Sequence, residues 1–215
     1  ISNIKSILCN ENGYYSSYLS DRYGFNNPDE EWDKKSIEYL VLGDSFAHGA
    51  CVNRPNDISS VLRSLSKKNV LNLGISGNGP LTEYATLREY KPKNVKNIIW
   101  IYFEGYDLLD LINEKKNFIL MNYIKDENFS QNLRNRNDAK DQVVKKITKK
   151  ENNKIYEKYI DDNKLKYKIL KFIRLDKTKK AIFINPVISE EVNEKVFKDF
   201  EDIMALTKIR AGKMK

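Results

Sequence analysis

Residues 37–49 read IEYLVLGDSFAHG and carry most of the information about the fold of this chain. The stretch from Ile37 to Leu42 is largely apolar and β-branched, and it ends sharply at Gly43. A short apolar run that stops at a glycine is typical of a buried β-strand. The segment therefore predicts a strand, with Ser45 directly beyond its carboxyl end.

The same alternation continues along the next sixty residues. Apolar runs at 70–73 and 98–103 predict two more buried strands, whereas residues 55–67 and 81–87 place apolar side chains at the helical spacing of three and four. Strands that alternate with helices at these intervals favour right-handed crossovers and a parallel sheet covered on both faces. We expect an α/β fold, a three-layer α/β/α arrangement with a mainly parallel sheet.

The regions on either side of this core differ from it in amino-acid composition. Residues 1–36 are polar and rich in turns, which predicts an irregular N-terminal lead-in, and 37–215 then form a single α/β domain. A Lys-rich helical insertion is expected at about 116–180, and 137–153 is its most polar stretch, which predicts a flexible linker. A last amphipathic helix is expected from 192 to about 211, with no further strand after it.

Composition argues against several classes of function. The net charge of +8 comes from 38 Lys and Arg against 30 Asp and Glu, but the lysines lie in mixed-charge stretches without a nucleic-acid recognition motif, so no nucleic-acid partner is expected. No apolar run approaches the roughly 20 residues that span a bilayer, which predicts a soluble segment without membrane contact, from a bacterial cytoplasm or periplasm. Because the segment begins at Ile1, an upstream signal or anchor remains compatible with the sequence.

The chain has two cysteines, Cys9 and Cys51, and neither stands at a metal-ligand spacing. In an exported protein they could form a disulfide that ties the N-terminal segment to the loop after Ser45. In a cytosolic protein they would be free thiols. A metal site is not expected.

Ser45 is the residue best placed for chemistry. The carboxyl ends of strands in an open parallel sheet are where binding sites form. A serine that begins a helical turn at this edge lies next to exposed backbone N–H groups, which can stabilise an alkoxide or an oxyanion. The sequence therefore makes Ser45 a candidate nucleophile.

The sequence around Ser45 is similar to the first block of the SGNH (GDSL-type) hydrolases, in which Gly-Asp-Ser is followed four residues later by a glycine, here Gly49. Residues 72–80, NLGISGNGP, resemble the second block of this superfamily. The resemblance implies an esterase or acyltransferase with Ser45 as nucleophile. It also implies an oxyanion hole formed by the backbone N–H groups of Ser45 and Gly77.

Residues 103–107, FEGYD, stand where the third block of the family usually reads Gly-Asn-Asp. The amide of that asparagine donates to the oxyanion, and Tyr106 replaces it in this chain. Asp107 keeps its place and is expected to cap a helix or fix the loop. The resemblance places further residues around the site: Asp44, His48, Asn78, Glu104, Tyr106 and Asp107.

The family takes its catalytic base from an Asp-x-x-His block near the C-terminus, and this chain has no such block. Its single histidine is His48, three residues after Ser45. His48 could approach Ser45 on one helical face, or it could fix the loop. We expect the domain to be C-terminally incomplete in this chain, or to have lost its catalytic machinery.

Three functions follow as hypotheses. The first is a serine esterase or O-acetyltransferase without metal or organic cofactor. Residues 21–28 resemble a segment found in SGNH-like domains associated with bacterial surface polysaccharides, which implies an acylated carbohydrate as substrate. The second is a non-catalytic binding module that keeps the fold. The third is a basic adaptor that binds an anionic polymer through the Lys-rich half. The sequence makes no prediction of oligomeric state.

Overall fold

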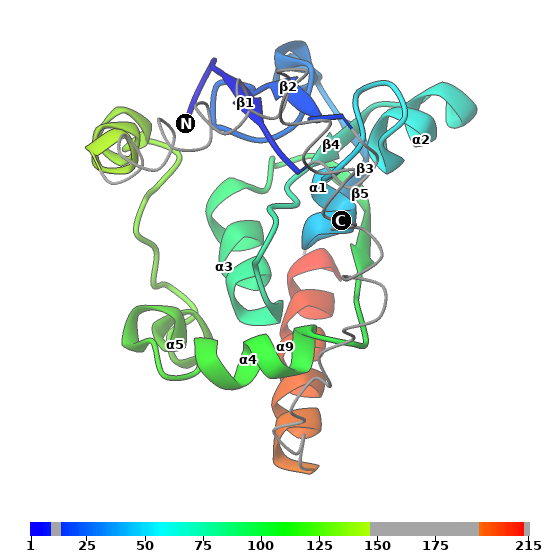
Figure 1. Ribbon diagram of the computed structural model, residues 1–215. Helices are drawn as coiled ribbons and strands as arrows, with labels where there is room; N and C mark the ends of the chain where they lie inside the picture. The colour runs from blue at the N-terminus through cyan, green and yellow to red at the C-terminus, as the bar shows by residue number, and fades with distance from the viewer. Residues whose placement is uncertain (10–13, 147–193, 213–215) are drawn as a thin grey trace, which may run out of the picture. The chain divides into compact units, whose positions relative to one another are not determined.

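The computed structural model describes residues 1–9, 14–146 and 194–212 (Figure 1). Contacts divide the chain into a first unit, Ile1–Lys140 with Val192–Lys215, and a second, Asp141–Glu191. The elements that surround Ser45 belong to the first unit. The fold of this unit is mixed α/β, as the sequence predicts.

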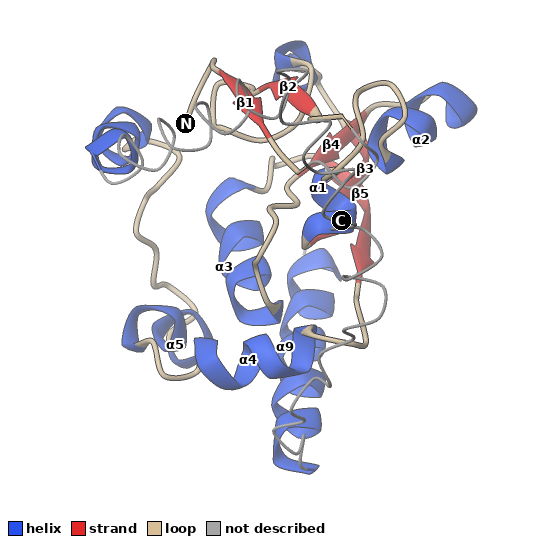
Figure 2. Ribbon diagram, in the orientation of Figure 1, coloured by secondary structure: helices blue, strands red, loops and turns tan. Residues whose placement is uncertain are grey.

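Three parallel strands form the central sheet (Figure 2). They are β3 (Ile37–Gly43), β4 (Val70–Asn72) and β5 (Val95–Ile101), with β3 in the middle. Val41 pairs with Asn72, and Gly43 with Ile101. All three predicted strands and their parallel direction are confirmed, and their carboxyl ends meet at one edge.

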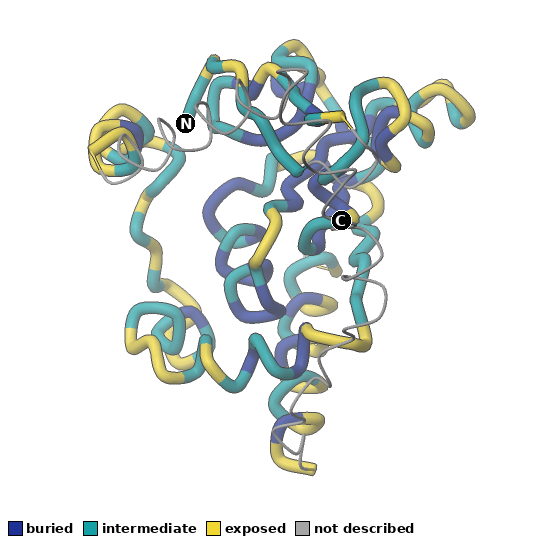
Figure 3. The backbone as a smooth tube through the Cα atoms, in the orientation of Figure 1, coloured by how far each residue is buried: buried dark blue, intermediate teal, exposed yellow. Residues whose placement is uncertain are grey.

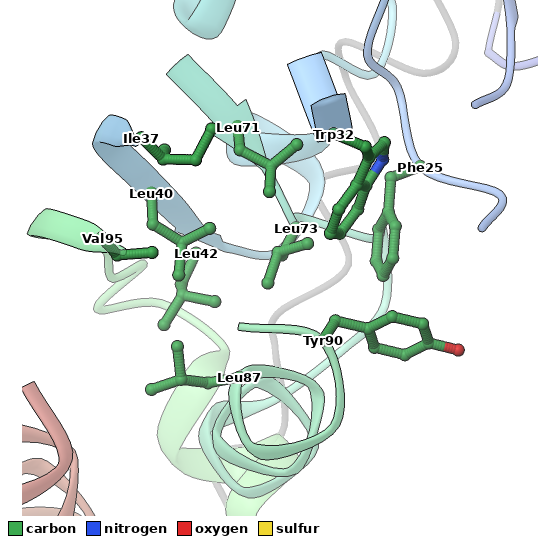
Figure 4. Packing of buried hydrophobic residues seen from close by; sticks show 10 residues of the cluster. All are labelled: Phe25, Trp32, Ile37, Leu40, Leu42, Leu71, Leu73, Leu87, Tyr90 and Val95. Atoms are coloured by element: carbon green, nitrogen blue, oxygen red, sulfur yellow. The ribbon is translucent and has the colours of Figure 1, made fainter. Parts of the chain in front are cut away.

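One face of the sheet packs against helix α3 (Pro80–Tyr90) and the short 3-10 helix η1 (Asp29–Asp33). α3 confirms the second predicted helix. Figure 4 shows the cluster that joins these elements, with Leu40 and Leu42 of β3 between the side chains of β4 and α3. Its buried members are Phe25, Trp32, Ile37, Leu40, Leu42, Leu71, Leu73, Leu87, Tyr90 and Val95.

The opposite face carries α1 (Ser45–His48) and α2 (Ile58–Ser66). Because side chains alternate along a strand, Val41 points to this face, where it packs with Ala47 and Val70. Helical elements therefore cover both faces of β3. This arrangement leaves the carboxyl edge of the sheet as the place where polar loops gather.

Helix α2 is confirmed, but of its apolar residues only Leu62 packs against the sheet, and most of the others lie on the solvent side. Leu65 is 80% exposed and Val61 41%, whereas Ser59 and Ser60 are buried (Figure 3). Helical spacing predicts which residues share a face, but not which face turns inward.

The irregular lead-in expected at 1–36 is partly wrong. Strands β1 (Lys5–Ile7) and β2 (Ser17–Leu19) form an antiparallel pair. Beyond them, the fully buried Asp21 accepts hydrogen bonds from the backbone N–H groups of Tyr23 and Phe25 and from Trp32 Nε1. A buried carboxylate with so many donors organises a segment whose polar sequence suggests a loop.

Several helices of the described residues lie beyond β5. Among them, α4 (Asp107–Glu114), α5 (Phe118–Lys125) and α9 (Glu194–Gly212) pack with α3. The helix after Asp107 and the last helix are confirmed. Residues 137–146 are helical, contrary to the predicted linker, and 147–153 lie outside the described residues, as does most of the Lys-rich segment. In the described ranges, no helix has both the length and the apolar character needed to cross a membrane.

A disulfide joins Cys9 to Cys51, whose Cα atoms are 5.0 Å apart. Of the two alternatives, a disulfide or two free thiols, the structure contains the disulfide. The bond links the end of the β1 segment to the loop that follows α1, 42 residues along the chain.

Replacement of both cysteines by alanine is expected to lower the free energy of unfolding by about 4 kcal/mol, because the unfolded chain loses a constraint on a loop of this length. Urea denaturation with and without reductant measures the effect. Reductant should lower the stability of the wild type to that of the double variant and leave the variant unchanged. Equal stability of the oxidised wild type and the variant would contradict the prediction.

Candidate functional site

Three loops meet at the carboxyl edge of the sheet. The loop after β4 joins the end of β3 where Ile75 N–H donates to the Gly43 carbonyl at 3.2 Å. The loop after β5 joins α1 where the rings of Phe46 and Phe103 lie 5.5 Å apart. The segments of all three sequence motifs therefore contact one another at this edge.

Ser45 is the first residue of α1, directly after the central strand. Asp44 caps this helix, because its Oδ1 accepts the Phe46 N–H at 3.1 Å. The Ser45 hydroxyl donates to Asp44 Oδ2 at 3.0 Å. Because α1 is a single turn, its dipole contributes little to the binding of an anion. An anion would instead be bound by individual backbone N–H groups of this turn.

Buried polar side chains hold this turn in place. Asn72, at the end of β4, donates from Nδ2 to the Ala47 carbonyl at 2.6 Å and accepts the Gly74 N–H at 2.8 Å. Asn27 accepts the Asn72 N–H at 2.8 Å. Gly74 packs so close to α1 that a Cβ there would lie 2.5 Å from Ala47 Cβ. Only glycine permits this approach.

Gly77 lies on the exposed part of the loop after β4. Its φ is +84°, in the left-handed region that favours glycine, and no atom lies within 4 Å of where its Cβ would be. Within the part of the chain that the structure describes, the backbone N–H groups of Ser45 and Gly77 have no hydrogen-bond partner. Asn78 forms the turn, because its N–H donates to the Ile75 carbonyl.

His48 is buried, and its ring nitrogens bond to residues other than Ser45. Nδ1 accepts the Ser76 N–H at 3.1 Å and lies 2.9 Å from Ser76 Oγ, while Nε2 lies 2.9 Å from the Tyr18 hydroxyl. An Nδ1 that accepts implies a proton on Nε2, which donates to Tyr18. Burial lowers the pKa of His48 to about 4. His48 thus fixes the Gly77 loop as a neutral side chain.

The loop after β5 contains the third motif. Asp107 is buried, and its Oδ2 accepts the Phe103 N–H at 2.6 Å. It therefore fixes the loop, whereas Tyr106 occupies the N-cap position of α4. The Tyr106 ring is 48% exposed and lies 5.6 Å from that of Phe103. Glu104 is exposed.

Carboxyl groups from α3 and α4 gather next to Asp44, and the sequence analysis missed most of them. Burial raises the pKa of Glu83 to about 9. The hydrogen bond from the Trp100 indole N–H acts to lower this pKa, whereas the negative charge of Asp107 acts to raise it further. Burial likewise raises the pKa of Asp107 to about 6, and the charge of Asp44 contributes. Glu114 accepts the Gly79 N–H at 2.8 Å. The apolar neighbours of Glu83 on its helix were a signal that it would be buried.

Comparisons of the chain with known protein families, with curated proteins and with solved structures find no match. In the described ranges, no group of three or more His, Cys, Asp or Glu side chains could hold a metal ion. A small cavity between α3, α5 and α9 is lined by none of the predicted site residues. The chemistry around Ser45 must therefore be inferred from its own side chains.

Replacement of His48 by glutamine is expected to change how stability depends on pH. Since the pKa of His48 falls from about 6.5 unfolded to about 4 folded, its contribution to stability is present above pH 6.5 and is lost as the pH falls. The stability of the wild type relative to His48→Gln should therefore drop by about 3 kcal/mol between pH 7 and pH 4. Urea denaturation at several pH values measures this, and parallel curves would contradict it.

Replacement of Glu83 by glutamine is expected to stabilise the protein at neutral pH. The raised pKa of Glu83 favours folding below pH 4.5, and this contribution is lost as the pH rises toward 9. Glu83→Gln should gain about 3 kcal/mol relative to the wild type at pH 7, and almost nothing at pH 4.

Glu89→Gln on the same helix is the matched control. Although burial acts to raise the pKa of Glu89, hydrogen bonds from Tyr123, Leu133 and their neighbours lower it overall. This variant should therefore be destabilised at pH 7. Thermal denaturation of both variants tests the opposite directions of the pKa shifts of Glu83 and Glu89. A loss of stability in Glu83→Gln at pH 7 would contradict the raised pKa of Glu83.

Proposed function

We propose that this chain is a serine ester hydrolase or acyltransferase domain of the SGNH kind, with a three-layer α/β/α fold. The observation that carries the proposal is the position of Ser45. Its hydroxyl lies directly beyond the central strand, bonded to a carboxylate, and the N–H groups of Ser45 and Gly77 are without partners among the described residues. A nucleophile and oxyanion donors are the minimum that acyl transfer requires.

In the proposed reaction, Ser45 Oγ attacks the carbonyl carbon of an ester. The N–H groups of Ser45 and Gly77 stabilise the negative charge that develops on the carbonyl oxygen. The alcohol leaves, and water or an acceptor hydroxyl then removes the acyl group from Ser45. Tyr106 stands where an amide donor would complete the oxyanion hole, so stabilisation depends on the two backbone groups.

An acylated carbohydrate is the proposed substrate. The segment 21–28 does not support this directly, because Asp21, Asn26 and Asn27 are buried and serve the fold. The support comes from the ring of Phe103, which contacts the rings of Tyr106 and of Phe46, the residue after Ser45. Phe46 and Tyr106 are about half exposed, and aromatic rings of this kind offer apolar surface to the C–H face of a sugar.

A non-catalytic binding module is the second candidate. It is favoured by His48, whose ring nitrogens bond to Ser76 and Tyr18, and by Tyr106 in place of an amide donor. In that case the same edge would bind a ligand without breaking an ester bond.

Replacement of Ser45 by alanine separates the two candidates. The wild type should hydrolyse p-nitrophenyl acetate and react with a fluorophosphonate probe, and Ser45→Ala should lose both activities by at least about a hundredfold. Ser64→Ala is the control, because Ser64 is an exposed serine of α2. Equal rates for the wild type and Ser45→Ala would refute the esterase proposal and favour the binding module.

A further inference from the structure

A serine nucleophile must transfer its proton to a base as it attacks. The single histidine of the chain is held by Ser76 and Tyr18, and its pKa of about 4 leaves it neutral. The side chain that accepts a hydrogen bond from the Ser45 hydroxyl is the neighbouring Asp44, at 3.0 Å. This distance lies within the range for proton transfer.

The two carboxylate oxygens of Asp44 have separate tasks. Oδ1 accepts the Phe46 N–H at 3.1 Å, which fixes the side chain against the first turn of α1. Oδ2 accepts the Ser45 hydroxyl. One oxygen thus orients the carboxylate, while the other accepts the hydroxyl of the proposed nucleophile within hydrogen-bond reach, as general base catalysis requires.

The groups around Asp44 are carboxyl groups rather than basic side chains. Among the described residues, no Lys or Arg forms an ion pair with it. The titratable groups that face it are the carboxyl groups of Glu83 on α3 and of Asp107 and Asp110 on α4, because the charge of Asp44 contributes to the raised pKa of each; Glu83, with a pKa of about 9, is uncharged at pH 7.

We infer that Asp44 is the catalytic base of Ser45, an inference that rests on the proposed esterase function. As the bond between Ser45 Oγ and the carbonyl carbon forms, the hydroxyl proton moves to Asp44 Oδ2 and the carbonyl π electrons move to oxygen. The tetrahedral intermediate collapses, the C–O bond to the alcohol breaks, and Asp44 returns the proton to the leaving oxygen. In deacylation, water or the acceptor alcohol gives its proton to Asp44, which returns it to Ser45 Oγ.

Asp44→Asn is the variant that tests the inference. Asparagine is as good an N-cap as aspartate, so its side-chain oxygen keeps the bond from the Phe46 N–H, but its amide cannot take a proton. Asp110→Asn is the matched control, since it removes a carboxyl group that faces Asp44 and does not contact Ser45. Circular dichroism and thermal denaturation establish that both variants fold.

The measured quantity is the rate of fluorophosphonate labelling of Ser45 between pH 6 and pH 9. The inference predicts that Asp44→Asn reacts about a hundredfold more slowly than the wild type at pH 7, and Asp110→Asn within about threefold of it. The rate of Asp44→Asn should rise about tenfold per pH unit, because hydroxide replaces the missing base, whereas that of the wild type should vary far less.

The outcomes separate this inference from the proposed function. If Ser45→Ala abolishes labelling but Asp44→Asn keeps the rate and pH profile of the wild type, Asp44 is not the base and the esterase proposal stands. If the wild type is not labelled at Ser45, both are overturned. If Asp110→Asn slows labelling as much as Asp44→Asn, the effect belongs to the charge of the cluster and the inference fails.

Discussion

The site depends on the hydrogen bonds of one buried side chain, Asn72. This residue ends β4, and its amide bonds to the carbonyl of Ala47 in α1 and to the N–H of Gly74 in the following loop. The loop that carries Gly77 and the turn that carries Ser45 are therefore held by the same amide. Because a buried amide that loses a partner costs about 1–3 kcal/mol, any displacement of one loop relative to the other is opposed.

The N-terminal segment extends this network away from the sheet. Asn27 bonds to both backbone groups of Asn72, and its amide donates to Asp21, which also accepts the Trp32 indole N–H. The disulfide fastens the same segment to the loop after α1. Residues whose sequence predicts a polar lead-in therefore hold the site in place through these bonds. This role explains why many buried polar groups lie before β3.

Much of the fold follows from local patterns in the sequence. The runs that end at Gly43, at Gly74 and near Phe103 predict β3, β4 and β5 and their common edge, because strand burial and glycine stops are local properties. The burial of Asp21 and the inward face of α2 were not predictable in the same way, since both depend on partners distant in the chain. The helical spacing of Ile58, Val61 and Leu65 correctly predicts a helix, but these three residues face the solvent and not the core.

The candidate site was likewise predictable only in part from local sequence. Ser45 follows from its position after a predicted strand, whereas Gly77 follows from the resemblance of residues 72–80 to the second SGNH block. A loop-fixing role for His48 is one of the alternatives that the sequence offers, but its partner Tyr18 is not predictable. The raised pKa of Glu83 is not predictable either, because it depends on burial that the fold supplies. Sequence patterns thus locate the candidate nucleophile, whereas the protonation states around it depend on tertiary packing.

The most direct test of this account is a crystal structure of the protein after reaction with a fluorophosphonate. The account predicts a phosphonyl group on Ser45 Oγ, with the phosphoryl oxygen within about 3.1 Å of the backbone nitrogens of Ser45 and Gly77. A phosphonyl group on another residue, or an oxygen on Ser45 that points away from Gly77, would contradict it.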